Sequence, residues 1–219
     1  MESKILIIRH GITEGNKKKW FYGATDIGLS EEGIIELEEQ RDSGLYPDVP
    51  EDARFFTTGM KRTEETLGIL FGDVEHGRIA DMKEMNFGDY ECRSFDLLKD
   101  DEVFLEWGYD QTGEIKLPNA ESRNEFRERT IRGGKSLIDE HIASNTPMTV
   151  MICHGGVISS FMDHLFSDGR SMWDWMPEPG CGYEVFFTDG KPAKYKAIGR
   201  IGDNLQTMID EYESENGEK

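Results

Sequence analysis

Two short runs of the chain are almost purely aliphatic, whereas the stretches around them are polar. Residues 5–8 read Ile-Leu-Ile-Ile, and residues 148–153 read Met-Thr-Val-Met-Ile-Cys. Runs of this length, rich in β-branched residues, are typical of strands buried on both faces, and such strands occur in sheets with helices on both sides. The chain is therefore predicted to be an α/β protein: a three-layer sandwich with a central, mostly parallel sheet flanked by helices.

The rest of the pattern indicates further strands and helices. Strands are predicted over 53–57, near 78–80, and over 183–187 and 193–198, the last two as a hairpin around Asp189-Gly190. Helices are predicted to start at Ser30 and Thr58, to run through 126–138 and to cover 157–166. The acidic end, from Asp210 to Lys219, is expected to be frayed.

Two of the predicted helices begin with a hydroxyl residue. The side chains of Ser30 and Thr58 can each accept a hydrogen bond from a free N–H of the first turn, so both are predicted to be N-caps. In the helix after Ser30, the apolar residues Ile34, Ile35 and Leu37 are expected to face the sheet.

Residues 94–117 are charged and aromatic, with apolar residues only loosely at helical spacing. They are predicted to form a small helical cap or lid, about 94–120, inserted in a single domain that covers 1–219. In the long helix that follows, Gly133-Gly134 marks either a kink or a close packing contact, because glycine is costly inside a helix.

Composition removes several classes of function. Lys plus Arg number 25 against 44 Asp plus Glu, and a net charge of −19 repels nucleic acid and acidic membrane surfaces. The cysteines, Cys92, Cys153 and Cys181, lack the spacing of a zinc site or a disulfide framework, so a reducing cytoplasm is the expected setting. No apolar run reaches the roughly 18 residues of a membrane span. Oligomeric state has no signature in the sequence.

Both aliphatic runs end in residues that carry chemistry. Arg9 and His10 follow the first run, and His154 follows the second, each next to a glycine turn. In open α/β sheets, ligands bind outside the carboxyl ends of the strands. The helix predicted over 157–166 follows His154 closely, and its free backbone N–H groups attract anions. The amide of Asn16 can reach an anionic oxygen as well.

The triplet Arg9-His10-Gly11, followed by Thr13 and Asn16, resembles the signature of the histidine phosphatase superfamily, the phosphoglycerate mutase-like proteins. Three further segments resemble this family in its order, within residues 4 to about 190: 58–66 with Arg62, 83–91 with Glu84, and 154–156 with His154. The resemblance implies that Glu84 is the proton donor. The expected substrate contacts are Arg9, Asn16, Tyr22, Gly23, Arg62 and Gly155.

These residues suit phosphoryl transfer through a covalent phosphohistidine. Neutral His10 is expected to attack phosphorus through one ring nitrogen while a backbone carbonyl holds the other. Arg9 and Arg62 are expected to bind the equatorial oxygens, and His154, protonated or donating, completes the clamp. Glu84 would protonate the leaving oxygen and then activate water. No metal or other cofactor is expected, because these groups supply the positive charge.

Three alternatives stay open. A metal hydrolase could use His10, His154, Glu84 and an acid such as Asp26, but it would not need Arg9 beside its first ligand. A non-catalytic phosphate-binding module on the same fold is the second. The third is a cofactor-dependent phosphoglycerate mutase. Mutases of this superfamily typically carry a longer insertion between the proton donor and the second histidine, so hydrolysis of a small phosphorylated metabolite is favoured.

Overall fold

A six-stranded sheet forms the centre of the computed structural model, which describes residues 3–202. The strand order is β4-β3-β6-β1-β7-β8. The four parallel strands are β4 (His76–Arg78), β3 (Arg54–Thr57), β6 (Met148–Cys153) and β1 (Ser3–Arg9). The two antiparallel strands are β7 (Gly182–Thr188) and β8 (Lys191–Ile198), which form the predicted hairpin. The mixed, mostly parallel sheet confirms the predicted fold class.

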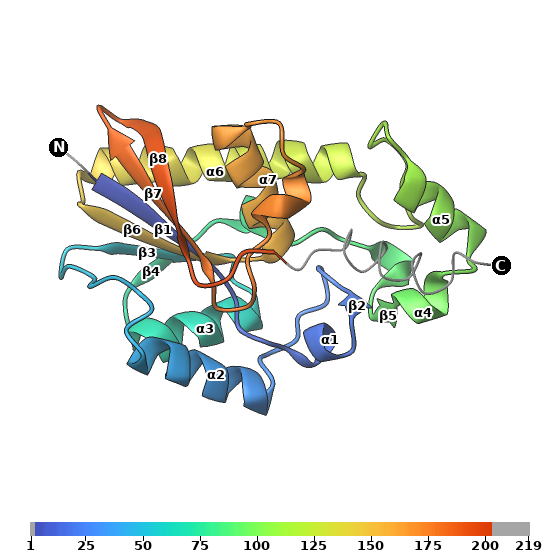
Figure 1. Ribbon diagram of the computed structural model, residues 1–219, viewed down its shortest axis with the longest axis horizontal. Coiled ribbons are helices and arrows are strands. Elements are labelled where there is room, and N and C mark those ends of the chain that lie inside the picture. Colours follow the sequence, from blue (N-terminus) through green and yellow to red (C-terminus); the bar gives the residue numbers. More distant parts are fainter. Residues whose placement is uncertain (1–2, 203–219) are drawn as a thin grey trace.

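Helices cover both faces of this sheet (Figure 1). Leu6 and Ile8 of β1 pack with α2 (Glu31–Asp42) and α3 (Lys61–Phe71). Ile5 and Ile7 point to the opposite face, because successive residues of a strand alternate, and they pack with α6 (Arg123–Ser144) and α7 (Gly155–Phe166). All four residues are buried, which is why this strand shows no polar alternation in the sequence.

The predicted cap is helical and lies beside the three layers (Figure 1). It contains α4 (Phe95–Leu98) and α5 (Glu102–Tyr109). Two buried aromatic side chains of α5 attach it to the rest of the protein: the ring of Phe104 lies 5.0 Å from that of Phe21, and the ring of Trp107 lies 6.0 Å from that of Phe87. These edge-on aromatic contacts dock the cap on the segments that lead to Gly23 and away from Glu84.

Short elements complete the described chain. They are α1 (Glu14–Lys17), the two-stranded pair β2 (Trp20–Phe21) and β5 (Arg93–Ser94), and the 3₁₀ helices η1 (Ala80–Met82), η2 (Gly88–Tyr90) and η3 (Met172–Trp175). The strand expected near 78–80 is β4, which ends at Arg78, so it lies about two residues closer to the N-terminus than predicted. No helix within residues 3–202 is long and apolar enough to cross a membrane. The segment 210–219, expected to be frayed, lies outside the described residues.

The prediction that Thr58 caps a helix was wrong. The helix α3 starts at Lys61, and its N-cap is Met60, which makes no side-chain bond to the helix. The carboxylate of Asp26 accepts a hydrogen bond from the N–H of Lys61 at 2.8 Å and so takes the place of a local cap. A residue from a distant loop therefore does what the sequence pattern assigned to Thr58.

The cap at Ser30 is confirmed, but the predicted inner face of its helix is only partly right. The Ser30 hydroxyl accepts the N–H of Gly33 at 3.1 Å. Of the three apolar residues expected to face the sheet, Leu37 is 1% exposed, whereas Ile34 and Ile35 are 37% and 55% exposed. Gly33 lies on the inner face of this helix together with Leu37. The backbone of Ile12 comes so close to Gly33 that any side chain at position 33 would collide with the Ile12 carbonyl group.

The glycine pair in α6 marks close packing, and the helix continues through it. A Cβ atom on Gly133 would lie 2.8 Å from the Met82 side chain, and one on Gly134 would lie 2.2 Å from the Phe161 ring. These glycines let α6 approach η1 on one side and α7 on the other.

Candidate active site

Two buried histidines meet at the carboxyl ends of neighbouring strands. His10 follows β1 and His154 follows β6, and Arg9 is paired with Cys153 in the parallel register of these strands. The two imidazole rings lie 5.3 Å apart in an edge-on arrangement. The parallel pairing of β1 with β6 thus joins two motifs that are far apart in the sequence.

His10 is held as a neutral imidazole with one defined tautomer. Its Nδ1 lies 2.7 Å from the carbonyl oxygen of Gly11, which can only accept, so Nδ1 carries the proton and Nε2 keeps its lone pair. Burial, with the nearby charges of Arg62 and Arg9, lowers the pKa of His10 well below its ordinary value. The Nε2 atom is therefore available as a nucleophile at neutral pH.

His154 is also neutral, and of the two expected states, protonated or donating, the structure fits the second. The Nε of Arg62 donates to His154 Nδ1 at 3.2 Å, which places the ring proton on Nε2, and Nε2 donates to the Thr58 hydroxyl at 3.0 Å. Burial, followed by the charge of Arg62, lowers the pKa of His154 well below its ordinary value. His154 is thus a neutral donor, and Thr58 belongs to the site.

Arg62 is fully buried and anchored by the loop 23–25. Besides its bond to His154, it donates from Nη2 to the carbonyl of Gly23 at 2.9 Å and from Nη1 to the carbonyl of Thr25 at 3.0 Å. These three bonds occupy three of the five guanidinium N–H groups. The remaining two are those that a phosphoryl oxygen could use.

The loop that anchors Arg62 is in turn organised by Glu91, a site residue that the sequence reasoning missed. Its carboxylate accepts the backbone N–H groups of Gly23, Ala24 and Thr25 at 2.9 to 3.1 Å. Burial acts to raise the pKa of Glu91, but hydrogen bonds from Thr25 and the backbone outweigh it, and the pKa is lowered. Glu91 is the last residue of the family-like segment 83–91, but nothing in the neighbouring sequence distinguishes it from the other glutamates.

The substitution Glu91→Gln is expected to weaken catalysis by loosening this loop. The amide group would present a donor to backbone N–H groups, and the loss of charge-assisted bonds worth about 1.5–3 kcal/mol corresponds to a ~10- to 100-fold fall in kcat/KM. Glu91 accepts four backbone N–H groups, three from the loop that anchors Arg62 and the fourth from Phe87. Because most of these bonds hold the Arg62 loop, activated and unactivated phosphomonoesters should suffer alike. Steady-state kinetics with both substrate types measures this, and the exposed Glu102→Gln is the control. An unchanged kcat/KM would refute the role.

Arg9 lies over the amino end of α7 with an unused donor. Its Nη1 donates to the carbonyl of Pro177 at 2.8 Å, while its Nε is buried and has no hydrogen-bond partner among the described residues. A Cβ atom on Gly155 would lie 3.2 Å from that Nε, so the glycine allows the guanidinium to pack against the helix terminus. A buried, unpaired charged donor next to a helix amino end is suited to an anion.

Glu84 reaches the same helix end. Its Oε2 accepts the N–H of Gly156 at 3.0 Å, and its Oε1 accepts the N–H of Met85 at 2.9 Å. Both arginines of the site, Arg9 and Arg62, also interact electrostatically with this carboxylate. The structure therefore brings all five predicted catalytic residues together: Arg9, His10, Arg62, Glu84 and His154.

Tyr22, Asn16 and Gly23 support this cluster. The Tyr22 hydroxyl lies 2.6 Å from that of Thr13 and donates to Asn16 Oδ1 at 3.0 Å, while its ring packs against the Arg62 guanidinium at 5.1 Å. Asn16 Oδ1 is committed to the capping box of α1, which leaves its NH2 group for an anion. The polar backbone atoms of Gly23 already bond to Glu91 and Arg62, and their role is to hold the loop.

Acidic and histidine side chains do not gather as metal ligands in the part of the chain that the structure describes. Within residues 3–202, no group of three or more His, Cys, Asp or Glu side chains has the arrangement of a metal site. Asp26, the acid considered for a metal hydrolase, instead binds the first N–H of α3.

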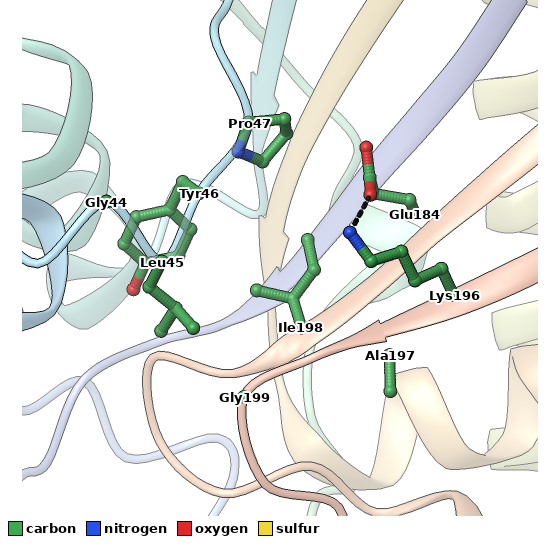
Figure 2. Close-up of a pocket in the computed structure, with 9 residues that line it drawn as sticks. All are labelled: Gly44, Leu45, Tyr46, Pro47, Glu184, Lys196, Ala197, Ile198 and Gly199. Carbon is green, nitrogen blue, oxygen red and sulfur yellow. Dashed lines mark ion pairs between the residues drawn. The ribbon is translucent and has the colours of Figure 1, made fainter.

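A pocket away from the histidines is shown in Figure 2. It lies between the segment 44–47 and the edge strand β8. Its polar lining residues are Tyr46, Glu184 and Lys196, and the Nζ of Lys196 lies 3.5 Å from a carboxylate oxygen of Glu184. Glu184 also binds Lys4 at 2.7 Å, so its charge is compensated within the protein. None of the five catalytic candidates lines this pocket.

Comparison with known proteins finds a family and relatives for this chain. Residues 5–197 match the family model of the histidine phosphatase superfamily (branch 1). Phosphoglycerate mutase from Schizosaccharomyces pombe is 26% identical over 72% of this chain and 77% of the mutase. Adenosylcobalamin/alpha-ribazole phosphatase from Salmonella typhimurium is 26% identical over 85% of this chain and 92% of the phosphatase. The structure of alpha-ribazole phosphatase from Shigella flexneri has a TM-score of 0.73 at 24% identity, over 90% of this chain and 95% of that chain.

Proposed function

This chain belongs to the histidine phosphatase superfamily, and its relatives include phosphatases and mutases. We propose that it hydrolyses phosphomonoesters through a covalent phosphohistidine on His10. The substrate is a small phosphorylated metabolite, and the reaction needs no metal ion. The observation that carries the proposal is the bond from His10 Nδ1 to the carbonyl of Gly11, which leaves Nε2 unprotonated among two arginines and a carboxyl group.

In the first step, a bond forms between His10 Nε2 and phosphorus while the bond from phosphorus to the ester oxygen breaks. Arg9 and Arg62 hold the three phosphoryl oxygens, and the Nε2–H of His154 turns from Thr58 to donate to one of them. Glu84 enters this step as the neutral acid and gives its proton to the departing oxygen, so the leaving group exits as an alcohol and Glu84 is left as a carboxylate.

In the second step, the carboxylate of Glu84 takes a proton from water, whose oxygen attacks phosphorus as the bond to His10 breaks. Inorganic phosphate is released, and both residues return to their starting protonation states. The amino end of α7, with Gly155 and Gly156, stabilises the negative charge on the phosphoryl group in both steps.

A phosphoglycerate mutase is the second candidate, because the relatives include proteins of that name. In a mutase, the phosphohistidine would return its phosphoryl group to a bound hydroxyl instead of water. The chemistry up to the phosphohistidine is shared, so the two functions differ only in what reaches the phosphoenzyme.

Competition between water and substrate distinguishes the two. With 3-phosphoglycerate and its bisphosphate primer, we expect phosphate release to exceed isomerisation at least ~10-fold, a barrier difference of about 1.4 kcal/mol. The assay is run in EDTA and extended to other phosphorylated metabolites, alpha-ribazole phosphate among them. Faster isomerisation would identify a mutase, activity that requires added metal would favour a metal hydrolase, and binding without turnover would indicate a phosphate-binding module.

The cytoplasmic setting that the cysteines predict stays a prediction.

A further inference from the structure

Glu84 lies in a segment that has no regular secondary structure of its own. The 3₁₀ helix η1 ends at Met82, the next one begins at Gly88, and 83–87 belong to neither a helix nor a strand. The backbone N–H and C=O groups of such a segment need partners from elsewhere in the protein. The position of the Glu84 carboxyl group therefore depends on what supplies them.

Arg129 of α6 supplies the partners of the carbonyl groups on and just before Glu84. Its Nη1 donates to the carbonyl of Asp81 at 2.8 Å and to that of Lys83 at 2.8 Å, and its Nη2 donates to the carbonyl of Glu84 itself at 3.3 Å. The other two N–H groups go to the carboxylate of Glu121. All five donors of this guanidinium are thus used, three of them on the backbone that carries Glu84.

Glu121 holds the same segment from the other side of Glu84. Its Oε1 accepts the N–H of Asn86 at 2.9 Å, and its own N–H donates to the carbonyl of Asn86 at 3.2 Å. The side chains of Arg129 and Glu121 are only 19% and 17% exposed, so this ion pair is largely shielded from water. One pair of side chains therefore fixes the backbone before and after Glu84.

The long helix is also docked firmly at this point. Gly133, one turn after Arg129 on the same face, lets α6 touch Asp81 and Met82 of η1. The glycine contact sets the distance between helix and segment, and the guanidinium fork then sets the orientation of the carbonyl groups.

We propose that Arg129 and Glu121 are positioning residues for the Glu84 carboxyl group. They do not touch the reacting atoms, and they hold Glu84 where it can protonate the leaving oxygen. This inference rests on the proposed function, because it assumes that Glu84 is the proton donor. It predicts that damage to the pair affects the protonation step more than the attack of His10.

Leaving-group dependence is the readout. An aryl phosphate such as 4-nitrophenyl phosphate departs without protonation, whereas an alkyl phosphate such as glycerol phosphate needs it. For Arg129→Met and Glu121→Gln we expect kcat/KM to fall at least ~10-fold more for the alkyl than for the aryl substrate. Arg129→Lys keeps the positive charge but loses the planar guanidinium group, and it disturbs the fold less than Arg129→Met. We expect it, too, to lose more kcat/KM with the alkyl than with the aryl substrate.

Arg132→Met is the matched control. Arg132 lies on the same helix and binds the same 3₁₀ turn, but through the side chain of Asp81 at 2.7 Å, and it is 64% exposed. Its loss should change both substrates equally and by less than ~2-fold, as expected for an exposed ion pair. Equal losses on the two substrates in folded Arg129 and Glu121 variants, or no loss at all, would overturn the positioning role.

A double-mutant cycle separates this inference from the proposed function. In the Glu84→Gln background, Arg129→Met should add less than ~2-fold to the loss with the alkyl phosphate, because the group it positions is gone. A full additional loss would overturn the positioning role alone. If Glu84→Gln itself shows no preference for the aryl substrate, the proton-donor assignment fails, and the inference fails with it.

Discussion

The variant His10→Ala is expected to lower kcat/KM for every phosphomonoester by at least ~10⁴-fold, because it removes the atom that forms the covalent bond to phosphorus. The fold should be retained. Within residues 3–202, the side chain of His10 makes one hydrogen bond, to Gly11, and β1 is secured on both sides by β6 and β7. A far-ultraviolet circular dichroism spectrum and a melting curve check this point.

Trapping the intermediate tests the assignment directly. A labelled phosphomonoester mixed with the wild-type protein and quenched in alkali, where a phosphoramidate survives, should leave label on the peptide that contains His10. The alanine variant should carry none. His164→Ala is the control, since His164 lies on the exposed side of α7 and should keep both label and activity. Label on another residue, or full activity in His10→Ala, would refute the mechanism.

The variant Glu84→Gln is expected to lose about 10³-fold in kcat/KM with an alkyl phosphate and less than ~10-fold with 4-nitrophenyl phosphate. Glutamine keeps the side-chain length but cannot deliver a proton. It can still accept the N–H of Gly156 through its amide oxygen, so the geometry of the α7 terminus should survive. The difference between the two substrates isolates proton donation from phosphate binding.

Kinetics over a series of phosphomonoesters with graded leaving-group acidity measures this effect, and the slope against leaving-group pKa should steepen in Glu84→Gln. The control is Glu106→Gln, the same chemical change on an exposed residue of the cap. Parallel lines for variant and wild type would mean that Glu84 binds or positions the substrate and does not protonate it.

The sequence alone was sufficient for the layers of the fold and for the place of the main candidate residues. The unbroken aliphatic runs at 5–8 and 148–153 require burial on both faces, and that requirement leads to a helix-covered, mostly parallel sheet. The position of Arg9, His10 and His154 directly after these runs follows from the chain itself. The identification of the family from these motifs is confirmed by the match over residues 5–197.

Sequence patterns failed where a contact comes from a distant segment. Thr58 had the local features of a cap, but Asp26 caps α3 and the Thr58 hydroxyl instead meets His154. Ile34 and Ile35 satisfied the helical period, yet the close approach of Gly33 to Ile12 turned them toward solvent. Periodicity reports that a helix has an apolar side, but the packing partner decides which residues that side includes.

Only the tertiary structure revealed what holds the site in shape. Glu91 and Arg129 are single charged residues in a chain with 44 acidic and 25 basic ones, and nothing local distinguishes them. Their importance comes from the backbone groups that they satisfy, Glu91 in the loop 23–25 and Arg129 at the end of η1 and in the irregular segment that follows it. Strand and helix patterns are local, because they arise from burial along a few residues. A hydrogen bond between segments forms only once the folded sheet and helices have brought its two partners together.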